Sequence, residues 1–172
     1  SGMSTTTQVI TAAEYVGLGS IAGGTPDFAA GQCAGCHSDK EADWSQTGHS
    51  DMFTLAIDGL KSDHYNGDCI SCHTLGFRPD AVNGGFDDVA ADLGWTFPDS
   101  VVDGNWQDIV DNYPQLAQLS NIQCENCHGP GSMHKGNKEG TAISLESGAC
   151  ASCHEEEPYH VRPTQWKNSA HA

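Results

Sequence analysis

Four copies of one five-residue pattern contain every cysteine of this 172-residue chain. The four motifs are Cys33-Ala34-Gly35-Cys36-His37, Cys69-Ile70-Ser71-Cys72-His73, Cys124-Glu125-Asn126-Cys127-His128 and Cys150-Ala151-Ser152-Cys153-His154. Two cysteines at this spacing place both sulfurs on one face of a helical turn, where they can add to the two vinyl groups on one edge of a porphyrin. The histidine that follows can then ligate the iron. The sequence therefore predicts four covalently bound haem c groups, with His37, His73, His128 and His154 as proximal ligands.

Other cysteine chemistry fits the pattern less well. Paired Cys-x-x-Cys units can hold zinc in a tetrahedral site, and cysteines in an oxidising compartment can form disulfides. Neither use requires a histidine directly after every second cysteine. Thioredoxin-like redox motifs occur singly, next to a βαβ pattern that this sequence lacks.

Five further histidines are candidates for the sixth coordination position of the irons. They are His49, His64, His134, His160 and His171. Two of them end a repeated element, because Trp44-Ser45-Gln46-Thr47-Gly48-His49 follows the first motif and Trp166-Lys167-Asn168-Ser169-Ala170-His171 follows the fourth. The recurrence predicts one repeated local structure, in which the tryptophan packs against a haem and orients its histidine.

The other three histidines stand in different contexts. His134 follows a Gly-Pro-Gly turn that can fold the chain back and carry it to a neighbouring haem. We expect one of His64 and His160 to be the fourth distal ligand, with a slight preference for His64, and the other could lie at the surface. Methionine is the other common sixth ligand, but the histidines suffice to fill all four irons.

The composition is acidic and lean in apolar residues. The chain has 23 Asp and Glu against 7 Lys and Arg, a formal net charge of −16, and 37% hydrophobic residues. This charge disfavours binding to nucleic acid or to anionic membranes. It indicates a solvated acidic surface, with a docking face for basic partners as the alternative. Four apolar macrocycles could supply much of the core that the chain itself is short of.

Export is expected because haem is normally attached to such motifs outside the cytoplasm. No segment approaches the roughly 18 consecutive apolar residues of a membrane span. The first residues also lack a basic region followed by an apolar one, so we interpret the chain as a mature form.

One domain over residues 1–172 is predicted, because the intervals of 36, 55 and 26 residues between motif histidines are too short for independent units. Residues 1–26 form an N-terminal segment that could make subunit contacts. The expected fold is mostly irregular, with a few short α-helices around four haems and very little β-structure. Helices are predicted over 39–48, 50–60 and 105–119, the last broken at Pro114. A turn of helix is predicted over 152–157, and a long loop with a short hairpin near Asn83 over 76–104.

Three segments carry a resemblance to a known group. They are the Trp-x-x-Ser/Thr-x-His element, Cys72-His73-Thr74-Leu75-Gly76-Phe77 with the later Asn83-Gly84-Gly85-Phe86, and Ile122-Gln123-Cys124-Glu125-Asn126-Cys127-His128-Gly129-Pro130-Gly131-Ser132-Met133-His134. From about Gln32 to Ala172, the chain resembles multihaem cytochromes related to the tetrahaem electron carrier of ammonia oxidisers. In size and haem number it is similar to the extracellular tetrahaem nanowire cytochromes of the OmcE type.

The resemblance implies a homopolymer with stacked haems, in which a histidine of one subunit can ligate a haem of the next. His171, the penultimate residue, could reach across in this way, and so could His49 or His64. It also implies an extracellular or cell-surface location, redox partner cytochromes and extracellular electron acceptors.

Electron transfer is the expected function, because bis-histidine irons keep their coordination unchanged and have no open position for a substrate. A monomeric or dimeric periplasmic electron shuttle is the alternative. A haem-based reductase would need a five-coordinate iron. The histidine count allows all four irons to be filled, and no Cys-x-x-Cys-Lys variant is present. We therefore expect an electron carrier and not an enzyme.

Overall fold

The structure is a computed structural model that describes residues 13–18, 20–22, 25–27, 33–134, 136, 147–155 and 161–170. The helices are α1 Ala34–Ser45, α2 Met52–Ile57, η1 Gly67–Cys69 (a 3-10 turn), α3 Ile70–His73, α4 Phe86–Leu93, α5 Asn105–Asn112, α6 Pro114–Gln118, α7 Cys124–His128, α8 Ser147–His154 and α9 Arg162–Lys167. The strands are β1 Ser20–Ala22 and β2 Thr25–Asp27, which pair antiparallel.

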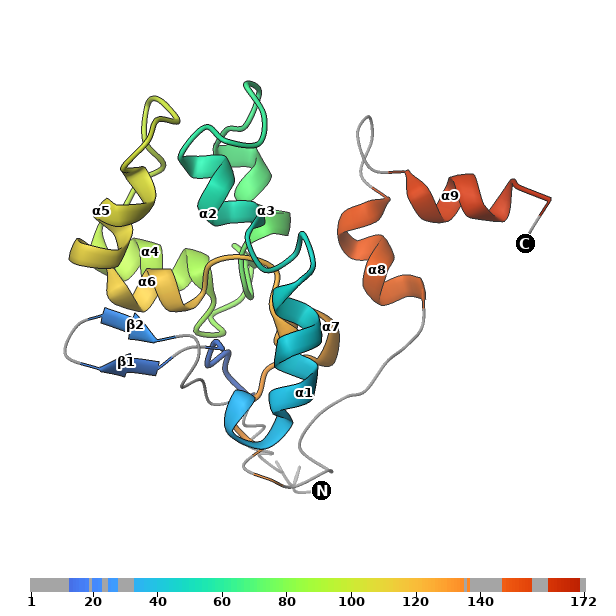
Figure 1. Cartoon of the computed structure of the whole chain (residues 1–172), viewed down its shortest axis with the longest axis horizontal. Coiled ribbons are helices and arrows are strands. Elements are labelled where there is room, and N and C mark those ends of the chain that lie inside the picture. The colour runs from blue at the N-terminus through green and yellow to red at the C-terminus, as the bar shows by residue number, and fades with distance from the viewer. Residues whose placement is uncertain are drawn as a thin grey trace, which may run out of the picture.

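The predicted fold class is confirmed. The described part of the chain consists of short helices joined by irregular segments, and its β-structure is limited to the β1–β2 pair (Figure 1). No helix of this part is both long enough and apolar enough to cross a membrane.

Each Cys-x-x-Cys-His motif lies in a helical turn. The first motif opens α1, the second runs through η1 and α3, the third is α7, and the fourth ends α8. Three of these helices stop at the motif histidine, and in α1 the helical geometry is interrupted at His37, where φ is −124° and ψ is 41°. The local geometry assumed for the motifs from their spacing is therefore present at all four.

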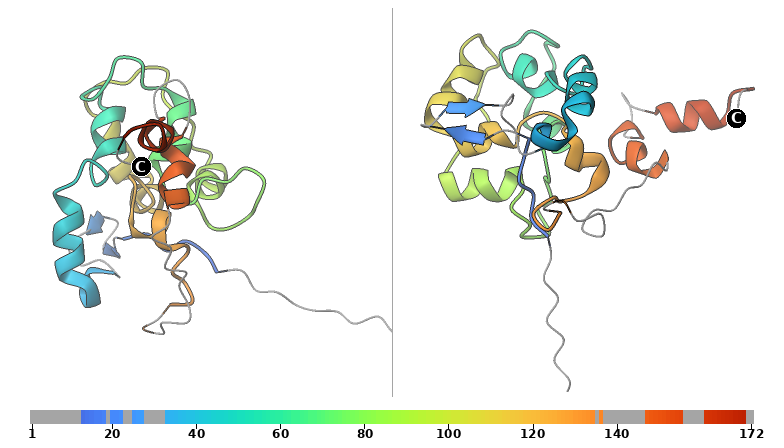
Figure 2. Two further views of the ribbon diagram at one scale, coloured as in Figure 1. Left: turned by 90° about the vertical axis from the view of Figure 1, so that its right-hand side faces the viewer. Right: turned by 60° about the horizontal axis from the view of Figure 1, so that its bottom comes forward.

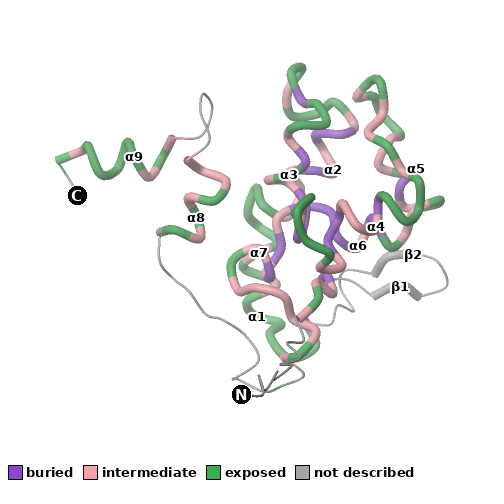
Figure 3. Tube along the Cα trace, turned by 180° about the vertical axis from the view of Figure 1, so that it is seen from behind, coloured by how far each residue is buried: buried purple, intermediate pink, exposed green. Residues whose placement is uncertain are grey.

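A conventional apolar core lies beside the motifs. Phe53 and Phe86 are fully buried, and their rings meet edge to face with centroids 5.5 Å apart. Phe86 also contacts Trp95, and Phe53 contacts Trp106 in the same manner. Each such aromatic pair stabilises the folded protein by about 0.5–1.5 kcal/mol, in addition to the effect of the apolar area that it buries. Figure 3 shows the buried stretches in the body formed by α1–α7, whereas α8 and α9 carry none.

The prediction of a loop over residues 76–104 is wrong in its middle, where the chain forms α4. The apolar residues Phe86, Val89, Ala90 and Leu93 recur at helical spacing, and the turn residues before them start the helix instead of a hairpin. The carboxylate of Asp88 accepts hydrogen bonds from the N–H groups of Asn83 and Gly84 at 2.7 and 2.9 Å. Such a carboxylate in the first turn stabilises a helix N-terminus.

Other helix predictions are confirmed in part. The break at Pro114 separates α5 from α6, because proline is tolerated only in the first turn of a helix. The helix predicted over 39–48 begins earlier, in the first motif, and that over 50–60 is shorter. Of the turn predicted over 152–157, residues 152–154 belong to α8, which starts at Ser147, and residues 156 and 157 lie outside the described residues. Residues 1–12, part of the predicted N-terminal segment, lie outside the described residues.

Replacing Phe86 by alanine should destabilise the protein by about 3–5 kcal/mol, because it empties the centre of this core. Chemical denaturation followed by circular dichroism would measure the change. Val82→Ala is the control, since Val82 is 94% exposed and surface changes stay within about 0.5 kcal/mol. Equal stability of the two variants would show that the core is elsewhere.

Candidate haem sites

Two motif histidines each face a second histidine from a distant segment. The ring centroids of His37 and His134 are 6.2 Å apart with an interplanar angle of 17°. Those of His49 and His154 are 6.1 Å apart at 44°. An imidazole nitrogen lies about 2.0–2.1 Å from a metal ion that it ligates and about 1.1 Å from its own ring centroid, so two rings on one ion stand about 6.3 Å apart. Both pairs therefore fit a single metal ion between the rings.

A turn after α7 brings His134 to His37. Gly129 adopts a positive φ of 78°, which favours glycine, and the N–H of His134 donates to the carbonyl of Gly131 at 2.9 Å. The chain folds back here, as predicted from the Gly-Pro-Gly sequence. His134 thus follows the third motif in sequence but lies opposite His37, the histidine of the first motif.

The element that ends at His49 is attached to the chain just before the third motif. The indole Nε1 of Trp44 donates to the carbonyl of Ile122 at 2.8 Å, and the N–H of Ile122 donates to the carbonyl of His49 at 3.1 Å. Trp44 and His49, the first and last residues of the element, are therefore both hydrogen-bonded to Ile122. This attachment orients His49 towards α8, which carries His154.

The second copy of the element has the same local structure. Thr47 donates through both N–H and Oγ1 to the carbonyl of Trp44, at 2.9 and 2.7 Å. Ser169 does the same to the carbonyl of Trp166, at 3.0 and 2.8 Å. The predicted repeat is thus confirmed in its hydrogen bonds. The environments differ, because Trp44 is half-buried against Ile122, whereas Trp166 on α9 is 59% exposed.

The three other candidate histidines are His64, His160 and His171. The side chain of His64 is 61% exposed, with Nδ1 2.6 Å from the hydroxyl of Ser62. His160 and His171 lie outside the described residues.

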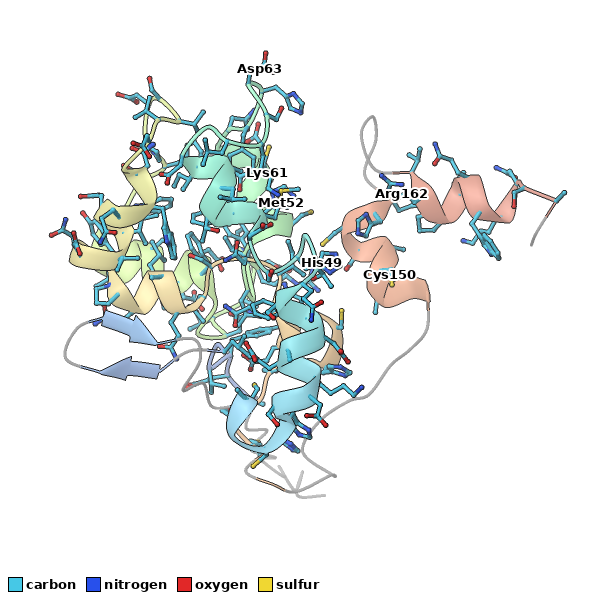
Figure 4. The ribbon with its side chains drawn as sticks, viewed as in Figure 1. His49, Met52, Lys61, Asp63, Cys150 and Arg162 are labelled. Atoms are coloured by element: carbon cyan, nitrogen blue, oxygen red, sulfur yellow. The ribbon has the colours of Figure 1, made fainter. Side chains whose placement is uncertain are left out.

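A cavity of about 450 Å³ surrounds the His49–His154 pair, within the usual size range of small-molecule sites. Its walls come from the loop after α1 and from α2, α3, α7 and α8. They include His49, Met52, Cys72, Cys127, Cys150 and His154. Figure 4 shows His49 and Met52 on the main body and Cys150 on the separate α8. The cavity therefore lies between the body and α8.

Cysteines of different motifs lie next to one another. A hydrogen bond joins the thiols of Cys33 and Cys124, which raises the pKa of Cys33 and lowers that of Cys124 to about 7. A second joins Cys72 and Cys153, and with burial it raises the pKa of Cys153.

The third and fourth motifs are close as well. The charge of Cys150 raises the pKa of Cys127, after burial as the larger cause. Cysteines of the first and third motifs thus interact, and so do those of the fourth and second, while Cys72, Cys127, Cys150 and Cys153 line one cavity.

Several residues that support the sites were not identified from the sequence. Tyr65 is buried and stacks parallel to His73, with ring centroids 5.4 Å apart. Gln123 caps α7, and Glu125 is buried between the two cysteines of the third motif. No other motif has a charged residue between its two cysteines, and this carboxylate was the available signal for Glu125.

The model of the family described as Cytochrome c554 and c-prime matches residues 32–92. The match supports a c-type cytochrome. The matched segment holds the first two motifs and His49, and it covers less than half of the chain. It supports bound haem c and an electron carrier rather than an enzyme, and c-type cytochromes are typically exported. Neither the curated proteins nor the solved structures contain a match.

The pairing of His49 with His154 predicts that α8 depends on this site for its position. Figures 1 and 2 show α8 and α9 to one side of the body. In His49→Ala we expect faster proteolytic cleavage of the fourth motif region from the rest, together with a ferric high-spin signal from one haem in electron paramagnetic resonance. Gln46→Ala, an exposed residue of the same turn, is the control. Cleavage at the wild-type rate in His49→Ala would contradict the pairing.

Proposed function

We propose that this c-type cytochrome transfers electrons through four covalently bound bis-histidine haems and is the subunit of an extracellular filament. The observation that carries the proposal is the proximity of the motifs. A hydrogen bond joins Cys33 to Cys124, another joins Cys153 to Cys72, and Cys127 and Cys150 line one cavity. This proximity supports four attachment sites that adjoin without a gap.

The histidines supply the second support. Haem iron, when bound, provides a one-electron couple whose potential the axial ligands set. His37 with His134 and His49 with His154 would each occupy both axial positions and leave none for a substrate. Two of His64, His160 and His171 would serve His73 and His128. Unchanged coordination in both oxidation states suits a relay.

The repeated element supports assembly into a polymer. Its first copy attaches to Ile122 of its own chain through Trp44 and His49. Its second copy has the same hydrogen bonds but presents an exposed Trp166, on a helix that stands away from the body in Figure 1. We propose that this copy makes the corresponding attachment to a neighbouring subunit and brings His171 to a haem there.

The net charge of −16 has a consequence for assembly. Like-charged subunits repel one another, and salt screens this repulsion with a Debye length of about 10 Å at 0.1 M. The filament should therefore form more readily as ionic strength rises. Basic redox partners would also be attracted to its surface.

Two measurements test the proposal on purified protein. Mass spectrometry of the denatured chain should show four covalent haem additions. Electron microscopy should show fibres in which the irons can be traced from subunit to subunit. Monodisperse particles under all conditions would favour the periplasmic shuttle instead, and a high-spin iron in the wild-type protein would favour a reductase.

Trp166→Ala should abolish fibres while the monomer keeps four haems, because it removes the indole that we propose to contact the neighbouring subunit. Trp44→Ala is the matched variant, since it removes the equivalent indole from the contact within the chain. It should disturb the haem at His154 in the monomer, visible in the electron paramagnetic resonance spectrum. Fibres of normal length in Trp166→Ala would contradict this mode of assembly.

A further inference from the structure

Glu125, inside the third motif, is a buried carboxylate, with 5% of its surface exposed. Both of its oxygens accept backbone N–H groups. Oε1 accepts from Gly131 at 2.5 Å and from Val16 at 3.2 Å, and Oε2 accepts from Gly17 at 2.8 Å. The pKa of Glu125 lies above its ordinary value, because burial raises it by more than these N–H groups lower it. Acceptance at both oxygens is the pattern of an ionised carboxylate.

The donors Val16 and Gly17 belong to a segment that is held along its whole length. We call residues 14–18 the N-terminal strap. Each of its five N–H groups donates to another part of the chain: Glu14 to Ser132 Oγ at 2.8 Å, Tyr15 to the carbonyl of Asn83 at 3.2 Å, Val16 and Gly17 to Glu125, and Leu18 to Gln123 Oε1 at 2.6 Å. Gly17 has a φ of +75°, and a Cβ there would lie 2.6 Å from the carbonyl oxygen of Gln118. The strap therefore has one register.

The third donor, Gly131, begins the turn that carries His134. The strap contacts the same turn, because the N–H of Ser132 donates to the carbonyl of Glu14 at 3.2 Å. The N–H of His134 then donates to the carbonyl of Gly131 at 2.9 Å. Glu125 and the strap thus hold the turn from two sides. Figure 2 shows the N-terminal strap running beside the turn after α7.

We propose that Glu125 is a positioning residue for the sixth ligand at the first motif. By joining the N-terminal strap to Gly131, its carboxylate fixes the turn that places the ring of His134 opposite that of His37. The inference rests on the proposed bis-histidine ligation. It adds a reason why a charge is buried within the third motif, since no neutral side chain of this length accepts N–H groups at both ends.

The test uses the full-length protein with its haems. In Glu125→Gln, one end of the side chain becomes a donor that faces other donors, so the turn is released. We expect a ferric high-spin signal in electron paramagnetic resonance, amounting to at most one haem in four. Added imidazole should remove this signal by replacing His134. Ser132→Ala removes one acceptor of the strap and leaves the carboxylate, so the same signal should be present but weaker.

Glu41→Gln is the control. Glu41 also acts electrostatically on Cys124, but it makes no hydrogen bond to the strap among those of the described residues. It should leave all four haems low-spin. If Glu125→Gln does not accumulate as a four-haem protein, Ser132→Ala decides the question.

His134→Ala separates the two possible failures. A high-spin haem in His134→Ala, with none in Glu125→Gln or Ser132→Ala, would overturn the positioning role and leave the ligand assignment intact. The absence of a high-spin haem in His134→Ala would overturn the assignment of His134 itself, and the inference with it. A high-spin signal in Glu125→Gln that imidazole does not remove would also overturn the positioning role.

Discussion

The distance between two imidazole rings on one metal ion is the constraint on which the arrangement of this molecule depends. The two observed separations, 6.2 Å for His37–His134 and 6.1 Å for His49–His154, both fit it. Each pair joins segments that are far apart in sequence. A ligated ion at either pair would close a long loop and, like a disulfide, restrict the unfolded chain. The hydrogen bonds around Ile122 and Gly131 serve to deliver the histidines to this distance.

The molecule divides into two parts that are stabilised differently. The segment from α2 to α6 buries Phe53, Phe86 and Leu75 completely and has an ordinary apolar core. By contrast, α8 and α9 bury no residue among those described, and α8 meets the body around the cavity that contains His154. The lean composition of the chain reflects this division. Apolar residues are concentrated between α2 and α6, where Ile70 of the second motif is part of the core, and none is buried in α8 and α9 among the residues described.

The sequence predicted the motifs and much of the local structure, because these depend on neighbouring residues. The helical turns of the motifs, the break at Pro114 and the repeat of Trp44 in Trp166 all follow from short-range patterns. The α4 helix was missed because Asn83, Gly84 and Gly85 are typical turn residues, which here form the start of a helix. The partners of the histidines could not be derived, since that requires knowing which distant segments meet. The Gly-Pro-Gly turn predicts that His134 reaches the haem site of another motif. The sequence does not indicate which of the other motifs this is.

Glu125 shows why spacing alone was insufficient. In the sequence, it occupies a variable position of a haem motif and would be assigned to the solvent-exposed face of the turn. In the structure, its carboxylate is buried because the N-terminal strap, more than a hundred residues away in sequence, supplies N–H groups to it. A buried carboxylate is stable only where donors compensate for the lost hydration. The buried carboxylate of Glu125 therefore depends on the N–H groups of the strap, and those N–H groups depend on the carboxylate as their acceptor. The role of either one could not be predicted without knowing that the two segments meet.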